Sequence, residues 1–238
     1  MTKEDIPIDF TGEFFVPGKS EERIEADHME RYHFACEFAQ GKSILDIACG
    51  VGYSAPLFIN TGAVSYAGVD INEKLIKYAN QTYGSDCISY HLGDICTFHN
   101  TKTYDIITCF ETIEHIEDYN GAINNLYSLL NRKGILFISS PNRPITSPGC
   151  SSLHDKPRNK FHIHEFIPEE LILILTNYGF IVNQNDIYGQ RQRKVYSNYF
   201  INKIYQVLMR KPDTNLSAMV TPVREKVPRY FVITATKE

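Results

Sequence analysis

Short apolar segments alternate with amphipathic segments along most of the chain, and several apolar segments end in a glycine turn or an acidic residue. Apolar runs bounded by turn residues predict strands, and apolar residues spaced along one helical face predict helices. We predict strands at residues 44–48, 64–69, 87–92, 104–110, 135–140, 180–183 and 230–236. We predict helices at residues 21–40, 53–60, 72–81, 122–130, 169–178 and 195–209, with Ser20 capping the first and Asn72 the third. This alternation predicts an α/β fold, a mostly parallel sheet with helices on both faces.

The composition is that of a globular protein. Hydrophobic residues make up 43% of the 238 residues and charged residues 22%, which excludes disordered and fibrous chains. No apolar run reaches the roughly 18 residues of a membrane span, and the acidic amino terminus lacks the positive charge and apolar stretch of a secretory signal. The six cysteines form no C-x-x-C pair, so we expect reduced thiols and a cytoplasmic protein.

The formal net charge of -4 conceals two regions of opposite sign. Residues 1–142 hold 10 basic and 20 acidic side chains, whereas residues 143–211 hold 10 basic and 5 acidic ones. The basic region includes a loop rich in Pro, Ser and Gly, and a long loop inside a compact domain is commonly functional. We therefore expect residues 143–165 and 190–211 to cover the substrate side of the site. The basic side chains of this region include Arg143, Lys156, Arg158, Lys160, Arg191, Arg193 and Lys194.

The residues that follow the predicted strands indicate a ligand site, because ligands of open parallel sheets bind beyond the carboxyl ends of the strands. Residues 46–52 form the end of the first predicted strand and the turn after it, where Gly50 and Gly52 permit a tight turn that a ligand can approach closely. Asp70 follows the second strand, where it can accept hydrogen bonds from two ribose hydroxyls. Asp94 follows the third, where it can accept one from an adenine amine. Together these residues predict a pocket for an adenosine-containing cofactor.

A dinucleotide cofactor is the alternative, since residues 50–55 match the G-x-G-x-x-A fingerprint of NAD-binding proteins. Asp46 is evidence against a dinucleotide, because a carboxylate in that position suits a cationic ligand better than a pyrophosphate. The Tyr-x-x-x-Lys pair of short-chain reductases occurs only at Tyr199 and Lys203, late in the chain and inside a predicted helix. We therefore favour a cationic adenosine cofactor.

The strings SILDIACGVGYSAPLF, GVDINEKLIKYA, GDI, YDIITCFETIEHIED and KGILFISSPNR resemble the successive motifs of class I S-adenosylmethionine (SAM) dependent methyltransferases over residues 43–142. The resemblance implies a Rossmann-like sheet of seven strands, mostly parallel, with the last strand antiparallel. It implies an amino-terminal arm and helix at residues 1–42 that cap the cofactor, and a SAM-binding domain at residues 43–238. It also implies that Asp46, Ala48, Gly50 and Gly52 hold the methionine part of SAM, Asp70 the ribose, and Asp94 with Ile95 the adenine. Phe15 and Tyr32 are expected to enclose the cofactor, and we add Ile71 and Phe110 to its predicted site.

The candidates for the chemistry follow the fourth predicted strand. If a helical turn begins there, Glu111, Glu114 and His115 stand at positions i, i+3 and i+4 and project from one face. Methyl transfer requires an aligned nucleophile and often a base, and His115 has a suitable side chain for that base. Glu111 is its predicted partner in catalysis.

A divalent cation offers a second interpretation of the same residues. Glu111, Glu114 and His115 can serve as metal ligands, with His162 or His164 arriving from the long loop as a fourth. The E-x-x-E-H string is similar to that of ubiquinone-biosynthesis O-methyltransferases and of small-RNA terminal 2′-O-methyltransferases, where it implies such a metal. The third interpretation is that Glu114 and His115 only pack the start of a helix. His28, His33, His91, His99 and His154 have no comparable neighbours and are interpreted as surface or core residues.

The sequence favours methylation of a hydroxyl on a sugar-like or other small polar acceptor. The strings TGEFFVPG and RYHFACEFA are similar to a leader in bacterial methyltransferases of glycan and sugar biosynthesis, although Phe14 stands where those proteins carry a basic residue. The basic cover predicts an anionic or nucleotide-linked acceptor. RNA ranks lower, because the overall charge is acidic and no basic-aromatic repeat occurs. N-methylation of an amino sugar or small molecule and non-catalytic SAM binding remain alternatives, and the oligomeric state is open.

Overall fold

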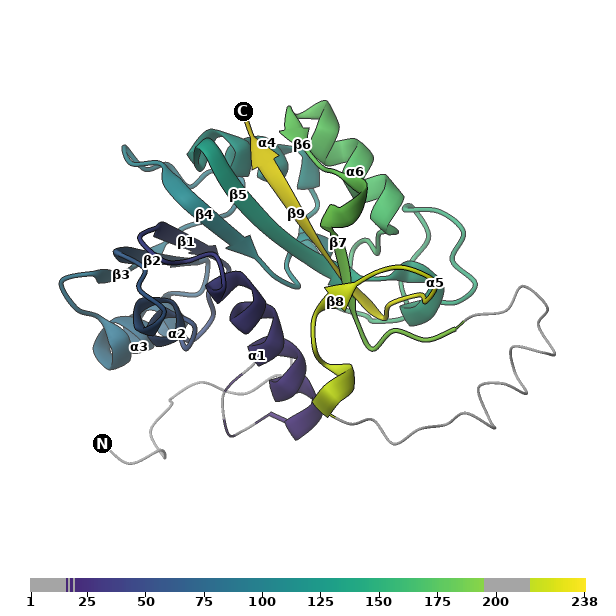
Figure 1. Cartoon of the computed structure of the whole chain (residues 1–238), viewed down its shortest axis with the longest axis horizontal. Helices are drawn as coiled ribbons and strands as arrows, with labels where there is room; N and C mark the ends of the chain where they lie inside the picture. Colours follow the sequence, from purple (N-terminus) through teal and green to yellow (C-terminus); the bar gives the residue numbers. More distant parts are fainter. Residues whose placement is uncertain (1–15, 17, 19, 195–214) are drawn as a thin grey trace.

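The computed structural model describes residues 16, 18, 20–194 and 215–238, whose strands form one sheet in the order β3-β2-β1-β4-β5-β9-β7-β8, with β6 paired to β9 (Figure 1). The strands are β1 (Ser43–Ile47), β2 (Ser65–Asp70), β3 (Ile88–Leu92), β4 (Tyr104–Cys109), β5 (Leu130–Pro141), β6 (Phe180–Ile181), β7 (Ile187–Gln190), β8 (Thr221–Pro222) and β9 (Tyr230–Lys237). Strands β1 to β5 are mutually parallel. Strand β9 runs antiparallel to β5, with Ile233 opposite Ile138. The mostly parallel sheet and its antiparallel last strand are confirmed.

The predicted number of seven strands is wrong for the described residues, whose sheet has nine. The predicted strand at residues 180–183 ends at Ile181, because the backbone N–H and the side-chain amide of Asn183 both donate to Asp186 at 2.8 Å and start a turn. Strands β7 and β8 were not predicted. They are short and contain Gly189 and Pro222, residues that weaken a strand pattern.

The helices and helical turns of the described residues are α1 (Glu22–Cys36), α2 (Ala55–Asn60), α3 (Glu73–Tyr83), η1 (Ile113–His115), α4 (Tyr119–Leu129), α5 (Arg143–Thr146), α6 (Pro168–Asn177), η2 (Gln184–Asp186) and η3 (Asn215–Ser217). Helices α1, α2, α3, α4 and α6 lie close to their predicted positions, whereas α5, η2 and η3 were not predicted. Asn72 caps α3 as predicted, accepting from the N–H groups of Lys74 and Leu75 at 3.0 and 3.4 Å. Ser20 does not cap α1, because its hydroxyl oxygen accepts from the N–H of Val16 instead. The helix predicted at residues 195–209 lies outside the described residues.

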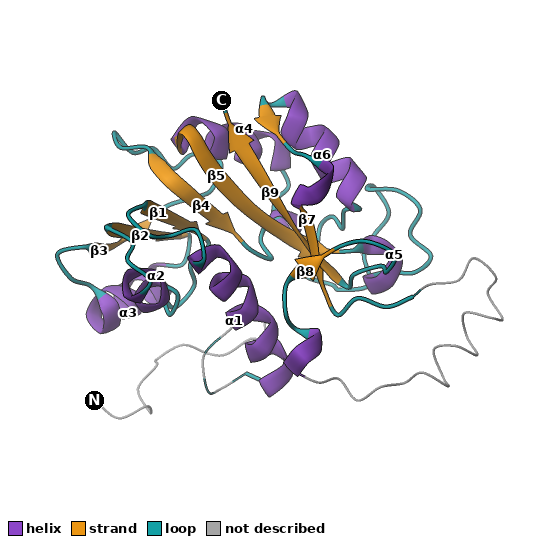
Figure 2. Cartoon of the chain, in the orientation of Figure 1, coloured by secondary structure: helices purple, strands orange, loops and turns teal. Residues whose placement is uncertain are grey.

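Two hydrophobic cores lie on opposite faces of the sheet, as the alternation of side chains along its strands requires. Leu45 and Ile47 of β1 belong to one core and Ile44 to the other. The first core takes in residues of α4 and α6, namely Ile123, Leu126, Leu171 and Leu175. The second takes in residues of α1, α2 and α3, namely Ala35, Phe58, Leu75 and Ala79. Figure 2 shows these helices around the strands, so the prediction of helices on both faces is confirmed. None of the helices in the described part of the chain is long and apolar enough to cross a bilayer.

Candidate functional site

A cavity of about 360 Å³ lies at the carboxyl ends of β1, β2 and β4. This volume is in the range of small-molecule sites. Of the predicted site residues, its wall contains Tyr32, Ala48, Gly50, Asp70, Ile71, Asp94, Ile95, Phe110, Glu111 and His115. Among the described residues, Asp46, Gly52, Glu114 and His162 were predicted to belong to the site and lie outside this wall. The strand ends therefore meet at one cavity, as the parallel sheet requires.

The turn after β1 gives the cavity a backbone surface. Ala48, Gly50 and Gly52 have φ angles of 58°, 56° and 79°, in the left-handed region that favours glycine. A Cβ at Gly50 would meet no heavy atom within 4 Å, so this position faces open space. A Cβ at Gly52 would lie 2.6 Å from the ring of Tyr90, whose hydroxyl donates to the Gly52 carbonyl at 2.7 Å. Gly50 thus leaves room at the cavity, whereas Gly52 leaves room for Tyr90.

Asp70 connects this turn to α3. One carboxylate oxygen accepts the N–H of Gly50 and the other accepts the N–H of Asn72, both at 2.9 Å. Burial raises the pKa of Asp70, and these two N–H groups act in the opposite direction. Each oxygen keeps a further lone pair with which it can accept a hydrogen bond from a ligand.

Asp46 lies behind the cavity and is fully buried. Its carboxylate accepts hydrogen bonds from the hydroxyls of Ser54 at 2.6 Å, Thr108 at 2.7 Å, Tyr66 at 2.8 Å and Tyr32 at 3.1 Å. Burial raises the pKa of Asp46, and the four hydroxyls act against that shift. The sequence predicted direct contact with the ligand. The structure instead connects Asp46 to the cavity through Tyr32, which lies in the wall.

We expect Tyr66→Phe to lower the free energy of unfolding by about 1–3 kcal/mol, because it removes one of the hydroxyls that satisfy this buried carboxylate. Urea denaturation followed by circular dichroism measures the change. Tyr78→Phe is the matched control, because the Tyr78 hydroxyl makes no hydrogen bond to another described residue. Equal losses of unfolding free energy in the two variants would contradict the stabilising role of the Tyr66–Asp46 hydrogen bond.

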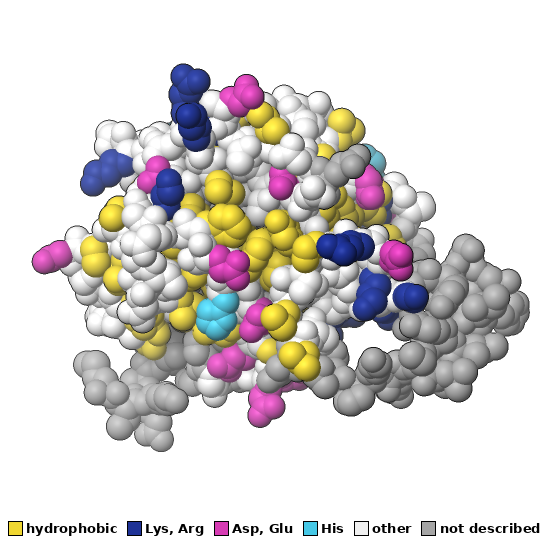
Figure 3. Space-filling model, in the orientation of Figure 1, with side chains coloured by type: hydrophobic (Ala, Val, Ile, Leu, Met, Phe, Trp, Pro, Cys, Tyr) yellow, Lys and Arg dark blue, Asp and Glu magenta, His cyan; other side chains and the backbone are white. Residues whose placement is uncertain are grey.

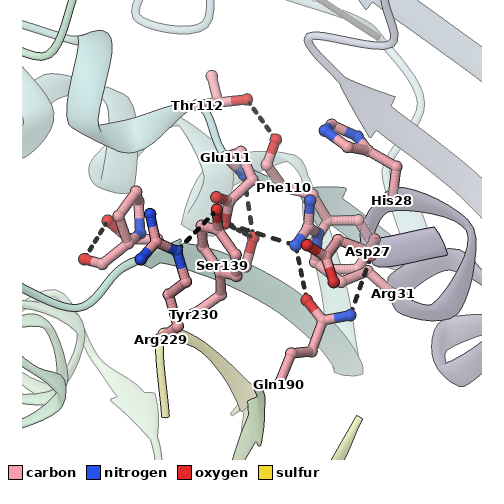
Figure 4. A network of polar contacts seen from close by, with 12 residues as sticks. Asp27, His28, Arg31, Phe110, Glu111, Thr112, Ser139, Gln190, Arg229 and Tyr230 are labelled. Atoms are coloured by element: carbon pink, nitrogen blue, oxygen red, sulfur yellow. Dashed lines mark hydrogen bonds and ion pairs between the residues drawn. The ribbon is translucent and has the colours of Figure 1, made fainter. Parts of the chain in front are cut away.

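Glu111 follows β4 and has a φ angle of 49°, uncommon for a residue other than glycine and typical of functional sites. Its N–H donates to the Ser139 hydroxyl at 3.0 Å, and that hydroxyl donates to Glu111 Oε1 at 2.8 Å. Arg31 Nη1 lies 3.9 Å from the same oxygen (Figure 4). The strained backbone and these contacts hold the Glu111 carboxylate at the cavity wall.

The structure brings Glu114, His115 and His162 together, with one candidate ligand atom of each lying within 4.8 Å of the others. Glu111 is not part of this group, although it lies with His115 in the cavity wall, so the structure does not bring all four predicted metal ligands together. The left-handed backbone at Glu111 interrupts the helical geometry that the prediction assumed, and η1 begins only at Ile113.

The long loop supplies the partners of these side chains. His115 Nδ1 donates to the Phe161 carbonyl at 3.0 Å, which leaves Nε2 of the neutral ring as an acceptor. The N–H groups of Ile163 and His164 donate to the Glu114 carbonyl at 2.9 and 3.1 Å. His162 Nδ1 lies 2.8 Å from Glu165 Oε1. The loop around residues 159–165 therefore lies directly against η1.

Glu114 supplies the carboxyl group of this cluster and is incompletely hydrogen-bonded. It is buried, and its Oε2 atom has no hydrogen-bond partner among the described residues. Burial and the nearby Glu111 carboxylate raise the pKa of Glu114 well above its usual value. An orphan buried carboxylate beside two imidazoles is a feature that a cation would satisfy.

The sequence reasoning missed His28, which lies in the cavity wall and was interpreted as a surface or core residue. Burial and the Arg31 charge lower the pKa of His28 well below its usual value, so its ring is neutral at neutral pH. His28 and Tyr32 are four residues apart on α1, and that spacing would have placed both on one helical face.

Two arginines of the predicted basic cover have structural roles. Arg143 is buried and forms an ion pair with Glu170 at 2.6 Å, and Arg191 is buried against Asp27 at 2.8 Å. Their guanidinium groups are therefore committed to carboxylates of the chain. These two residues therefore lend no support to the predicted attraction of an anionic substrate.

Comparison with known proteins identifies relatives of this chain. A family model for the methyltransferase domain matches residues 21–185. The chain is 29% identical over 177 residues to a "Probable S-adenosylmethionine-dependent methyltransferase" of Mycolicibacterium smegmatis, with 74% of this chain and 66% of that protein covered. It is 29% identical over 178 residues to a ubiquinone biosynthesis O-methyltransferase of Glaesserella parasuis, with 68% and 74% covered. The chain spans about half to two thirds of the length of the mycobacterial relatives it matches.

A solved structure shares the fold. The N-methyltransferase NodS of Bradyrhizobium japonicum, in complex with S-adenosyl-l-homocysteine (SAH), superposes with a TM-score of 0.61 at 17% identity, covering 92% of this chain and 89% of that chain. At this level of identity the likeness establishes the architecture only.

Proposed function

This chain belongs to the class I SAM-dependent methyltransferases, and on that premise we propose that it transfers the methyl group of SAM to a hydroxyl of a small polar acceptor. The observation that carries the proposal is the composition of one cavity wall. Asp70 ends β2 and Asp94 follows β3 there, and Glu111 and His115 follow β4. Groups suited to an adenosine and groups suited to proton transfer thus share a single cavity.

The residues of the wall fit SAM. Asp70 has an oxygen available for each of two ribose hydroxyls, beyond the two N–H groups it already accepts. Asp94 accepts the Cys96 N–H through Oδ1 at 2.7 Å, which leaves Oδ2 for the adenine amine. Ile71 is 71% exposed beside Asp70 and provides an apolar surface for the adenine ring.

The methionine part of the cofactor is assigned to the backbone at Ala48 and Gly50, where the turn leaves open space. Tyr32 and Phe110 enclose it, and their rings pack edge to face at 5.1 Å. Asp46 fixes the Tyr32 hydroxyl from behind. When bound, SAM supplies an electrophilic methyl group on a sulfonium centre.

We assign the general base to His115. Its Nδ1–H is held by the Phe161 carbonyl, so Nε2 is the atom that can accept the proton of the acceptor hydroxyl. Glu111, fixed by Ser139, is placed in the same wall to orient the acceptor hydroxyl. Displacement at a methyl group depends chiefly on such alignment.

A divalent cation at Glu114, His115 and His162 is a second candidate role, favoured by the orphan Glu114 oxygen. The Phe161 carbonyl and the Glu165 carboxylate would fix the two imidazoles from behind, as is usual for histidine ligands. Ligation through His162 Nε2 requires the exposed Asn159 amide, 2.8 Å away, to move aside. A cation held there would supply Lewis acidity toward the acceptor hydroxyl.

Metal removal tests this role. If a cation is required, exhaustive chelation abolishes methyl transfer and added Mn²⁺ or Mg²⁺ restores it. Calorimetric titration of Mn²⁺ into chelator-treated protein should show binding that Glu114→Gln and His162→Ala abolish and that His154→Ala, a change at an exposed histidine, retains. Activity that survives chelation would exclude the metal and leave His115 as a base alone.

The proposed acceptor is anionic or nucleotide-linked, and the proposed place of action is the cytoplasm. Incubation with methyl-labelled SAM and a panel of sugar phosphates, nucleotide sugars, amino sugars and short RNA tests the assignment. We expect label on a hydroxyl of a small molecule. Label on an amine or on RNA 2′-oxygens would replace the proposed acceptor. SAM binding with no transfer to any member would favour a non-catalytic SAM-binding protein.

A further inference from the structure

Arg229 stands out among the basic residues near the cavity, because it has no carboxylate partner within the described part of the chain. It immediately precedes β9 and is partly exposed. Its Nε donates to the Tyr230 hydroxyl at 3.3 Å, and its guanidinium carbon lies 5.6 Å from the Tyr230 ring centroid. Arg143 and Arg191, by contrast, each form an ion pair with a carboxylate, Arg143 with the half-buried Glu170 and Arg191 with the buried Asp27.

A second guanidinium lies close to Arg229. The backbone of Arg193 pairs with that of Val227, through hydrogen bonds of 2.9 and 2.8 Å, which brings residue 193 alongside the segment that leads to Arg229. Partial desolvation and the neighbouring charge of Arg229 lower the pKa of Arg193. An anion beside both guanidinium groups would be attracted by two positive charges at once. Figure 3 shows Lys and Arg side chains gathered on the side of the molecule where β8 and α5 lie in Figure 1.

Arg229 is connected to the cavity through Tyr230. Arg31 also lies 5.6 Å from the Tyr230 ring centroid, and its Nη1 is 3.9 Å from Glu111 Oε1. Figure 4 shows Arg229 bonded to the Tyr230 hydroxyl, and Arg31 directed toward Glu111. Arg31 and Ser139 both lie against Glu111, which reduces the repulsion that its carboxylate would exert on a nearby anion. A ligand group at Arg229 would therefore lie beside the acceptor end of the cavity.

We infer that Arg229, the Tyr230 hydroxyl and Arg193 form a subsite for a phosphate group of the methyl acceptor. The inference rests on the proposed function and specifies its substrate class as a phosphate ester or diphosphate that carries the reacting hydroxyl. Guanidinium groups suit this role because their forked N–H donors match the oxygens of phosphate. The subsite is separate from the residues assigned to SAM, so the two can be tested independently.

The test compares Arg229→Gln with Arg132→Gln in SAH-loaded protein. Arg132 is an exposed arginine near the amino end of β5, whereas Pro141 at the other end of that strand is paired with Tyr230. Calorimetric titration with inorganic pyrophosphate should show binding that Arg229→Gln weakens about tenfold or more and that Arg132→Gln leaves unchanged. SAH affinity should be the same in both variants. With a phosphorylated acceptor, Arg229→Gln should raise KM much more than it lowers kcat.

The outcomes separate the two levels of the proposal. Pyrophosphate binding that is absent from the wild-type protein, or equal in Arg229→Gln and wild type, overturns the subsite while SAH binding still supports the methyltransferase assignment. Binding of malonate without binding of pyrophosphate overturns the phosphate class in favour of a carboxylate. Failure of the wild type to bind SAH contradicts the proposed function instead. If Arg229→Gln does not fold, Arg229→Lys replaces it in the test. This variant keeps the positive charge but lacks the forked N–H donors, so it should bind pyrophosphate more weakly than the wild type.

Discussion

Asp70→Ala should lower the affinity for SAM by about 100-fold or more. The carboxylate is assigned to both ribose hydroxyls, and hydrogen bonds to a charged group are each worth about 1.5–3 kcal/mol. The same oxygens hold the N–H groups of Gly50 and Asn72, so the variant also loosens the turn that faces the methionine part. Isothermal titration calorimetry with SAM and SAH measures the loss.

Asp86→Ala is the matched control for this variant, because Asp86 is an exposed acid that precedes β3. Its affinity for SAM should equal that of the wild type. The Asp70→Asn variant keeps one acceptor oxygen, so its affinity for SAM should lie between those of the wild type and Asp70→Ala. An unchanged affinity in folded Asp70→Ala, judged by its thermal midpoint, would refute the assignment of the pocket.

His115→Ala should reduce kcat for methyl transfer by about 10²–10⁴-fold, the usual contribution of a general base, while SAM affinity stays within a few-fold. We expect kcat to fall without a matching loss of SAM affinity, because the adenosine is assigned to Asp70 and Asp94 and not to His115. Release of SAH in the presence of the labelled acceptor measures kcat, and calorimetry measures the affinity.

His91→Ala is the control for the loss of an imidazole, since His91 is exposed and lies 3.1 Å from the Ser89 hydroxyl on β3. It should turn over at the wild-type rate. Turnover that is unchanged in His115→Ala would rule out its catalytic role and leave the interpretation that His115 only packs against the long loop.

The sheet and its ligand edge could be predicted because their signals are local. A short apolar run ending in Gly, Asp or Glu is visible in the sequence, and the geometry of parallel strands brings such ends together. Asp70 and Asp94 could thus be assigned to the ligand site from sequence alone, and both lie in the cavity wall. Strands β7 and β8 escaped prediction because four-residue and two-residue strands carry almost no periodic signal.

The arrangement after β4 could not be predicted, because it depends on one backbone angle. The helical spacing of Glu111, Glu114 and His115 assumed right-handed backbone throughout, but the φ angle at Glu111 is 49°, and Glu111 is not part of the group that Glu114 and His115 form with His162. Nothing in the string ETIEH marks that angle. Ser139 and Arg31, which hold Glu111, come from the neighbouring strand β5 and from α1, 28 and 80 residues away in the sequence.

The charge pattern was misleading for a similar reason. Arg191 pairs with Asp27, which is 164 residues away in the sequence, and Arg143 pairs with Glu170 across the long loop. Such partners are invisible until the chain is folded, so a count of basic residues overstates the charge available to a substrate. Asp46 shows the same effect, because its hydroxyl partners come from several different elements.

A crystal structure of the protein with bound SAH would show directly which residues hold the cofactor. We expect the ribose hydroxyls of SAH to lie within hydrogen-bond distance of the Asp70 carboxylate. We also expect the adenine to lie beside Asp94 and the sulfur to face Glu111 and His115. SAH bound elsewhere, or an adenosine whose ribose does not contact Asp70, would contradict the assignment of this cavity to SAM.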